Sequence, residues 1–176
     1  MTRPILIHPD PRLKKLCDPV DRIDGELQAL IDGMFETMYA APGIGLAAPQ
    51  VGVTRRLIVM DCAGKEEEGE APRPIALVNP EILETSEELS TYNEGCLSVP
   101  DIYADVTRPA NVRVRYVTRD EGEVERDFEG IEATCVQHEI DHLNGRLFID
   151  YLGPMRRQRI TQKMRKLKRE RARAAG

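Results

Sequence analysis

The segment His138-Glu139-Ile140-Asp141-His142 places two of the three histidines of this chain four positions apart. On an α-helix, residues at this spacing lie about 40° apart around the axis and about 6 Å apart along it. Two imidazoles can therefore hold one divalent metal ion, while Glu139 lies near the same face and can take a proton from metal-bound water. The pattern thus requires a helix here, with one face turned towards a site. A helix with two surface histidines and a salt-bridging glutamate is the alternative interpretation.

Length and composition favour a single domain. With 176 residues and a hydrophobic fraction of 41%, the chain can bury one modest core. No apolar run approaches the ~20 residues that span a bilayer, and the apolar patch after Met1 is too short for a secretory signal. We therefore expect a cytoplasmic protein with no membrane contact. Its cysteines are widely scattered, which favours core packing, metal binding or nucleophilic roles over disulfides: they are Cys17, Cys62, Cys96 and Cys135.

Charge is distributed unevenly along the chain. Residues 151–176 contain ten Lys and Arg and one acidic residue, a net charge of about +9, which leaves about −14 in residues 1–150. An acidic body with a basic terminus indicates that the terminus has its own partner. We expect a single catalytic domain over 1–150 and a basic, helical extension of the same domain over 151–176. A solvated helix that is loosely docked on the body is the simpler alternative for this extension.

Hydrophobic periodicity predicts the main elements. Apolar residues at helical spacing predict an amphipathic helix capped by Asp24, and strict alternation from Val112 onward predicts a hairpin. The predicted elements are a helix over Asp24–Ala40, strands over Leu57–Met60 and Ile75–Val78, a hairpin of Val112–Tyr116 with Val124–Phe128, a helix over Ile131–Leu143 and a last helix from Pro154. Strands grouped before a central helix favour an α+β fold. We predict mostly antiparallel β-sheets packed around the H-E-x-x-H helix, plus a C-terminal helix.

Two histidines do not make a tight site, so a third ligand is expected. Cys135 lies on the same helical stripe, but the shared metal would lie about 7.5 Å along the axis from its Cα, and its side chain leans away from that point. Because a thiolate ligand must come within about 2.3 Å of the metal, Cys135 is better interpreted as buried packing. Cys96 is the better candidate, since it lies on a separate segment where Gly95 permits close backbone approach and Pro100 limits strand pairing. Taken alone, Cys96 would more often be a core residue.

Three segments together resemble the motifs of bacterial peptide deformylases, in their usual order. They are Gly43-Ile-Gly-Leu-Ala-Ala-Pro-Gln50, Glu94-Gly-Cys-Leu-Ser98 and Gln137-His-Glu-Ile-Asp-His142. The combination is far more specific than any one segment, and the resemblance covers about residues 40–145 and continues after Tyr151. It implies a metal-dependent hydrolase that removes the N-formyl group from formyl-methionine at the start of nascent polypeptides and releases formate.

The resemblance also implies a role for each matching residue. It implies that the metal ligands are Cys96, His138 and His142. It implies that Glu139 is the acid/base residue and that the oxyanion is stabilised by Gln50 and the backbone N–H of Leu97. It places the substrate backbone at Ile44, Gly45 and Gly95, the methionine side chain at Ile131, Thr134 and Cys135, and a supporting ion pair at Glu94 and Arg108.

One position departs from a common form of the family pattern. Many members carry an arginine where this chain has Tyr103. The position belongs to the entrance rather than to the chemistry, so the departure concerns substrate preference beyond methionine. For the cofactor, the resemblance implies one divalent metal per chain: Fe²⁺ is expected in the cell, and Zn²⁺, Ni²⁺ or Co²⁺ can occupy such a ligand set in purified protein.

Two other functions remain open from the sequence. A zincin-type metalloprotease shares H-E-x-x-H, but it would need neither Cys96 nor the segment Gly43–Gln50. A non-catalytic RNA-binding module would use a closed, structural metal site and would tolerate Glu139→Gln. The resemblance instead supports formyl-methionine nascent peptides as the substrate. It also supports contact of the basic C-terminal helix with ribosomal RNA near the exit of the nascent chain.

Overall fold

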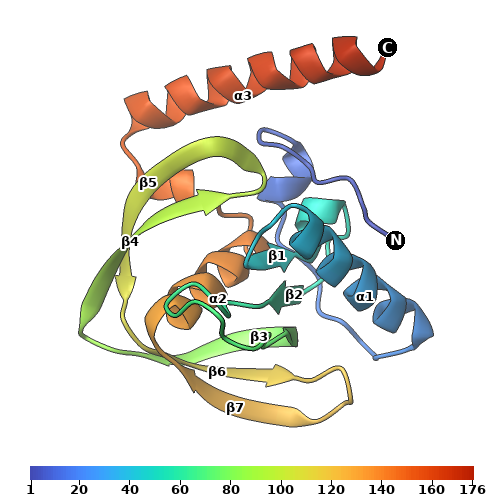
Figure 1. Cartoon of the computed structure of the whole chain (residues 1–176), viewed down its shortest axis with the longest axis vertical. Coiled ribbons are helices and arrows are strands. Elements are labelled where there is room, and N and C mark those ends of the chain that lie inside the picture. The colour runs from blue at the N-terminus through green and yellow to red at the C-terminus, as the bar shows by residue number, and fades with distance from the viewer.

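The computed structural model describes residues 1–176. Its main sheet is antiparallel and five-stranded, with the order β1-β2-β3-β6-β7 (Figure 1). The strands are β1 (Gly45–Ala47), β2 (Leu57–Met60), β3 (Ile75–Thr85), β6 (Val112–Val117) and β7 (Glu123–Phe128). The hairpin of β6 and β7 and the strand β2 were predicted from alternation and apolar runs, and these predictions are confirmed.

A separate two-stranded sheet forms a long hairpin along one side of the molecule (Figure 1). Its strands are β4 (Leu89–Cys96) and β5 (Val99–Pro109). The register shifts between Gly95 and Cys96. This shift leaves Pro100 in a bulge, where its missing N–H costs no ladder hydrogen bond.

The strands β1 and β2 of the main sheet are buried on both faces, because a helix packs against each face there. In β2, Leu57 packs with α1 (Gly25–Ala40), whereas the next residue, Ile58, packs with α2 (Gly130–Leu143). Successive side chains of a strand point to opposite faces, so one strand contributes to both cores. This part of the sheet therefore lies between the two helices.

The two helices begin and end where local chemistry predicts. Asp24 accepts a hydrogen bond from the Leu27 backbone N–H at 2.9 Å and so caps α1. After α2, Gly145 adopts a left-handed conformation with φ 76°, which favours glycine. Most residues of α2 are buried, and Figure 1 shows this helix in the middle of the molecule. The predicted α+β fold around a central H-E-x-x-H helix is confirmed.

The chain ends in α3 (Pro154–Ala175), which Figure 1 shows lying across one end of the molecule. Ile160 and Met164 of α3 are buried in a third core with Ile7 and with residues of β5 and the 3₁₀-helix η3 (Phe148–Tyr151). The remaining 3₁₀-helices are η1 (Pro11–Lys14) and η2 (Ala48–Val51). None of the helices has the apolar length that a bilayer crossing requires.

Two parts of the sheet structure differ from the sequence predictions. The strand predicted over Ile75–Val78 continues to Thr85, because Asn79 takes a positive φ of 51° and the register shifts around Pro80 instead of ending there. The apolar pattern also did not predict β4 and β5 as paired strands. Many residues of this hairpin are exposed or only half-buried, so it lacks a continuous apolar signal.

Candidate metal centre and active site

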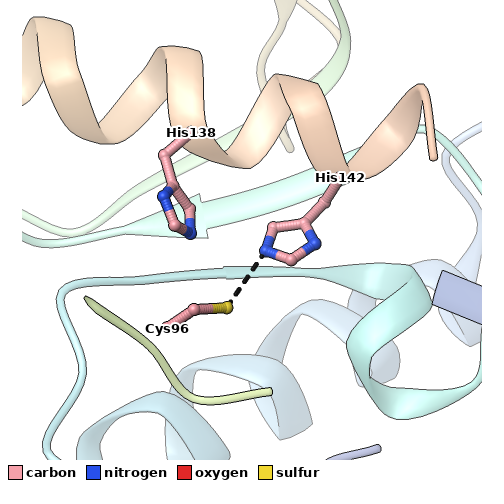
Figure 2. Close-up of side chains that lie close together, drawn as sticks. All are labelled: Cys96, His138 and His142. Atoms are coloured by element: carbon pink, nitrogen blue, oxygen red, sulfur yellow. Dashed lines mark hydrogen bonds between the residues drawn. The ribbon is translucent and has the colours of Figure 1, made fainter. Parts of the chain in front are cut away.

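Two histidines of α2 and one cysteine of β4 converge at a single point. The ligand atoms of Cys96, His138 and His142 all lie within 4.8 Å of one another, and Cys96 Sγ lies 3.3 Å from His142 Nε2. Figure 2 shows both imidazoles pointing from the helix towards the cysteine. The ring centroids are 5.1 Å apart and the ring planes are inclined at 65°. Both histidines are buried, so the interpretation as surface histidines is wrong.

A hydrogen bond outside the cluster orients His138. Glu94 Oε1 lies 2.9 Å from His138 Nδ1, and a carboxylate acceptor at this distance requires that Nδ1 carries the proton. The lone pair on His138 Nε2 is then free to bind a metal. One thiolate and two imidazoles are a donor set that suits divalent transition metals, and three protein ligands leave a coordination position open. The residues present therefore fit the metal that the sequence predicts.

A buried ion pair holds Glu94 in place. Arg108 donates to both carboxylate oxygens of Glu94, at 2.7 and 2.9 Å. Arg108 also donates to Asp141 Oδ2 at 2.8 Å, and the Tyr151 hydroxyl donates to the same oxygen at 2.7 Å. Burial would raise the pKa of Glu94, but the hydrogen bonds from His138 and Arg108 outweigh burial and lower it. Glu94 therefore remains a carboxylate that can orient His138.

The family resemblance predicted the ion pair of Glu94 and Arg108. It did not predict that Asp141 and Tyr151 belong to the same hydrogen-bond network. Asp141 stands within the H-E-x-x-H segment, where its place on the same helix was an available signal. Tyr151 stacks over the Arg108 guanidinium at 4.9 Å from its ring centroid as well as bonding to Asp141. Nothing in the local sequence around Tyr151 points to this contact.

Glu139 is buried beside the cluster without a hydrogen-bond partner for its Oε1. Burial is the main reason that its pKa rises to about 7; the charge of His138 opposes the rise and that of Glu94 adds to it. A carboxyl group with such a pKa can accept and return a proton near neutral pH. The Glu139 carboxyl group can occupy this position because residue 45 is glycine: a Cβ there would lie 2.5 Å from Glu139 Oε2.

The two histidines of the cluster have opposite pKa shifts. Burial would lower the pKa of His138, but Glu139, Cys96 and Glu94 outweigh burial and hold the pKa well above its ordinary value. The pKa of His142 lies well below its ordinary value because of burial and the charge on His138. The acidic surroundings therefore favour positive charge between these residues. A bound cation would replace the proton on His138 Nε2, while the proton on Nδ1 stays in the hydrogen bond to Glu94.

Gln50, in η2, is buried and turned towards the cluster. Its Oε1 accepts from the Ala47 backbone N–H at 2.9 Å, which fixes the orientation of the amide. Its Nε2 donates to Ser98 Oγ at 3.0 Å and lies 3.6 Å from Cys96 Sγ. Leu97 lies in the turn between β4 and β5, where its backbone N–H takes part in none of the loop hydrogen bonds. Ser98 is fully buried and was not predicted as part of the site.

A cavity of about 500 Å³ opens beside the cluster, with Cys96, Glu139 and Gln50 in its wall. All six residues predicted to bind substrate also line it: Ile44, Gly45, Gly95, Ile131, Thr134 and Cys135. Tyr103 stands at the rim with 62% of its surface exposed. Its ring packs over Gly95, where a Cβ would lie 2.6 Å from a ring carbon. The departure at Tyr103 thus lies at the entrance.

Cys135 belongs to the cavity wall and not to the metal cluster. Its Sγ donates to the Ile44 carbonyl oxygen at 3.7 Å. The contact with Cys62 and burial raise the pKa of the Cys135 thiol well above its ordinary value. Cys135 therefore presents a neutral thiol to the cavity, which suits packing rather than metal binding.

An α+β fold with a thiolate, two imidazoles and a proton-accepting glutamate at one cavity defines a protein of the metallohydrolase type. A profile of the polypeptide deformylases matches residues 2–158. The chain belongs to the polypeptide deformylase family.

Individual relatives are similar over almost the whole chain. The peptide deformylase of Afipia carboxidovorans is 57% identical over 165 residues, which cover 93% of this chain and 94% of that protein. The peptide deformylase of Mesorhizobium japonicum is 51% identical over 170 residues, covering 97% and 95%.

Solved structures agree with the fold. The crystal structure of a peptide deformylase from Legionella pneumophila has a TM-score of 0.88 at 46% identity, covering 98% of this chain and 99% of that chain. The crystal structure of peptide deformylase from Ehrlichia chaffeensis in complex with actinonin has a TM-score of 0.89 at 39% identity, covering 96% and 98%.

Proposed function

We propose that this protein is a peptide deformylase, a metal-dependent hydrolase that removes the N-formyl group from formyl-methionine at the N-terminus of nascent polypeptides and releases formate. The observation that carries the proposal is the convergence of Cys96, His138 and His142 beside the buried Glu139 at one cavity. A zincin-type protease has no use for the thiolate of Cys96. A non-catalytic module has no use for a buried, unpartnered carboxyl group next to the cluster.

In this reaction Glu139 handles the protons. It accepts a proton from the attacking water and passes one to the leaving amine, so that the C–N bond breaks and formate and a free amino group are formed. A divalent cation held by Cys96, His138 and His142 supplies the Lewis acidity that makes water nucleophilic near neutral pH. Because burial brings the pKa of Glu139 to about 7, the carboxyl group is suited to both transfers.

The surrounding residues bind and orient the substrate. One N–H of the Gln50 amide bonds to Ser98 and the other faces the cluster, where it and the Leu97 backbone N–H can donate to the oxyanion. Each such donor contributes ~3 kcal/mol of transition-state stabilisation. We assign the substrate backbone to Ile44, Gly45 and Gly95, and the methionine side chain to the wall formed by Ile131, Thr134 and Cys135.

The metal in the cell is proposed to be Fe²⁺, and Zn²⁺, Ni²⁺ or Co²⁺ can occupy the site in purified protein. The same three donors suit each of these ions, so the chemistry of the ligands does not select one. Metal analysis of protein purified without oxygen, together with formate release by the same sample, tests the assignment. Recovery of the activity lost in air by added Fe²⁺ and a thiol reductant supports iron; unchanged activity in air argues for zinc or nickel.

The substitution Glu139→Gln tests the proposed reaction. It keeps the size of the side chain and removes its proton chemistry, so formate release from a formyl-Met peptide should fall at least ~10²-fold. Metal content should not change. Glu132→Gln is the matched control, because it makes the same change on the same helix at a residue that pairs with Arg126 outside the cluster. Near-normal activity of Glu139→Gln, or cleavage of an unformylated internal peptide bond by the native protein, would overturn the proposal.

We further propose that residues 1–150 form a single catalytic domain and that residues 151–176 are its helical extension. Contact of α3 with ribosomal RNA near the exit of the nascent chain would bring the enzyme to its substrate in the cytoplasm. In support, the buried side of α3 leaves basic residues on its outer side exposed: Arg159, Lys163, Lys166 and Arg169.

Sedimentation with ribosomes tests this contact. Replacing Lys163, Lys166 and Arg169 by Glu should abolish co-sedimentation, because the same residues would then repel phosphates. A control with the same change in net charge replaces the exposed residues Lys15, Arg22 and Arg55 by Glu. Equal, salt-insensitive binding of native protein and both variants would exclude the α3 contact.

A further inference from the structure

The N-terminal segment, residues 1–8, is hydrogen-bonded to Gln50 and to Ser98, which accepts a hydrogen bond from the Gln50 side-chain amide. The Leu6 backbone N–H donates to the Gln50 carbonyl oxygen at 2.7 Å, and the His8 backbone N–H donates to the Ser98 carbonyl oxygen at 2.9 Å. The side chains of Gln50 and Ser98 are in turn bonded to each other at 3.0 Å. The segment therefore joins η2 to the turn after Cys96.

The side chain of His8 attaches this segment to α3. His8 Nε2 lies 2.8 Å from Thr161 Oγ1, and the Thr161 hydroxyl donates to the Arg157 carbonyl oxygen at 3.0 Å. A hydroxyl group has one proton, so His8 Nε2–H must be the donor in the first bond. His8 is buried, and its Nδ1 has no partner. A neutral ring is the only form that leaves no unpaired buried donor, and burial lowers the pKa of His8 to about 4 accordingly.

We propose that His8 and Thr161 are positioning residues for the deformylase reaction: their hydrogen bond anchors the N-terminal segment to α3, and the segment holds the Gln50 amide at the metal cluster. This inference rests on the proposed function, because it needs Gln50 to act as an oxyanion donor. Neither residue lines the cavity, so any effect on the rate must be transmitted through the segment. The bonds concerned are all buried or partly buried, which makes the loss of one partner costly.

The pair Thr161→Val and Thr161→Ser tests the anchor. Valine keeps the shape and removes the hydroxyl, and kcat should fall roughly three- to tenfold because the oxyanion donor is misplaced by a fraction of an ångström. KM should change little, since the cavity wall is untouched. Serine keeps the hydroxyl and should keep kcat near the native value.

Thr37→Val is the matched control. The Thr37 hydroxyl donates to the Gly33 carbonyl oxygen at 2.7 Å and accepts from the Arg3 backbone N–H at 2.8 Å. Thr37 thus also bonds a helix to the N-terminal segment. The helix is α1 instead of α3, and the bonded residue, Arg3, precedes Leu6, which contacts Gln50. Its replacement should lower Tm and leave kcat unchanged.

A double-mutant cycle with Gln50→Ala decides whether the effect passes through Gln50. In the Gln50→Ala background, Thr161→Val should cause no further loss of kcat. His8→Leu should reproduce the loss in the native background, and combining it with Thr161→Val should add nothing. Additive losses, or equal losses of kcat in Thr161→Ser, Thr161→Val and Thr37→Val, would overturn the inference. Absence of formate release by the native protein would instead overturn the proposed function.

Discussion

Replacing Gly45 with alanine tests the packing that places Glu139. A Cβ at position 45 would lie 2.5 Å from Glu139 Oε2 and 2.8 Å from Cys135 Sγ. Ordinary contact begins at 3.4 Å, so the carboxyl group must retreat by the difference, about 0.9 Å. A displacement of about 1 Å at a reacting group costs about 10²-fold in rate. We expect kcat for formate release to fall by about this factor, with about 1–3 kcal/mol lost in stability through overpacking.

The assay separates this effect from general damage. Metal content should stay at the native level in Gly45→Ala, because the nearest atoms to the new methyl group belong to Glu139 and Cys135 and not to a metal ligand. Gly25→Ala is the control substitution, since a Cβ there meets nothing within 4 Å, and its kcat should be native. Gly45→Ala with native kcat and native Tm would refute the argument that Glu139 is tightly confined. Loss of metal would show that the clash reaches the ligands instead.

The buried polar groups set three further expectations. Arg108→Met leaves the buried Glu94 carboxylate without its guanidinium partner, so the free energy of unfolding in urea should fall by about 3–5 kcal/mol; a fall below about 1 kcal/mol would contradict this. Removal of the metal by a chelator should lower Tm, and adding it back should restore Tm, because the cation binds only the folded chain; an unchanged Tm would exclude such linkage. Burial lowers the pKa of His8 from 6.5 to about 4, so the unfolded chain takes up this proton first as the pH falls. Native protein should therefore lose up to about 3 kcal/mol more stability than His8→Gln between these two pKa values, and parallel stability–pH curves would refute this.

Local sequence signals predicted the elements whose patterns are regular. The helix after Asp24 and the hairpin from Val112 have one periodicity each and clear ends, and both lie where they were predicted. The hairpin of β4 and β5 contains proline, glycine and a shift of register, and many of its residues are exposed or half-buried. Its pairing is stabilised by the partner strand rather than by an apolar pattern, so periodicity could not reveal it.

The residues of the site likewise divide into those that local sequence signals predict and those that they do not. The spacing of His138 and His142 and the reach of a helical cysteine were enough to favour Cys96 over Cys135, because both arguments use helix geometry alone. Helix geometry could not predict contacts between segments that are far apart in the sequence. His8 and Thr161 are separated by 153 positions, and a single hydrogen bond leaves no periodic trace in either segment.

Charge balance explains why this buried cluster suits a divalent cation. Around it, Cys96 as a thiolate, Glu94 and Asp141 each contribute a negative charge, and Arg108 contributes one positive charge. Two positive charges from the cation then make the group neutral while Glu139 is protonated, and leave a single negative charge when Glu139 is ionised. Low dielectric surroundings penalise any larger imbalance. Ionisation of Glu139 therefore changes the charge of this group by one unit, from neutral to a single negative charge.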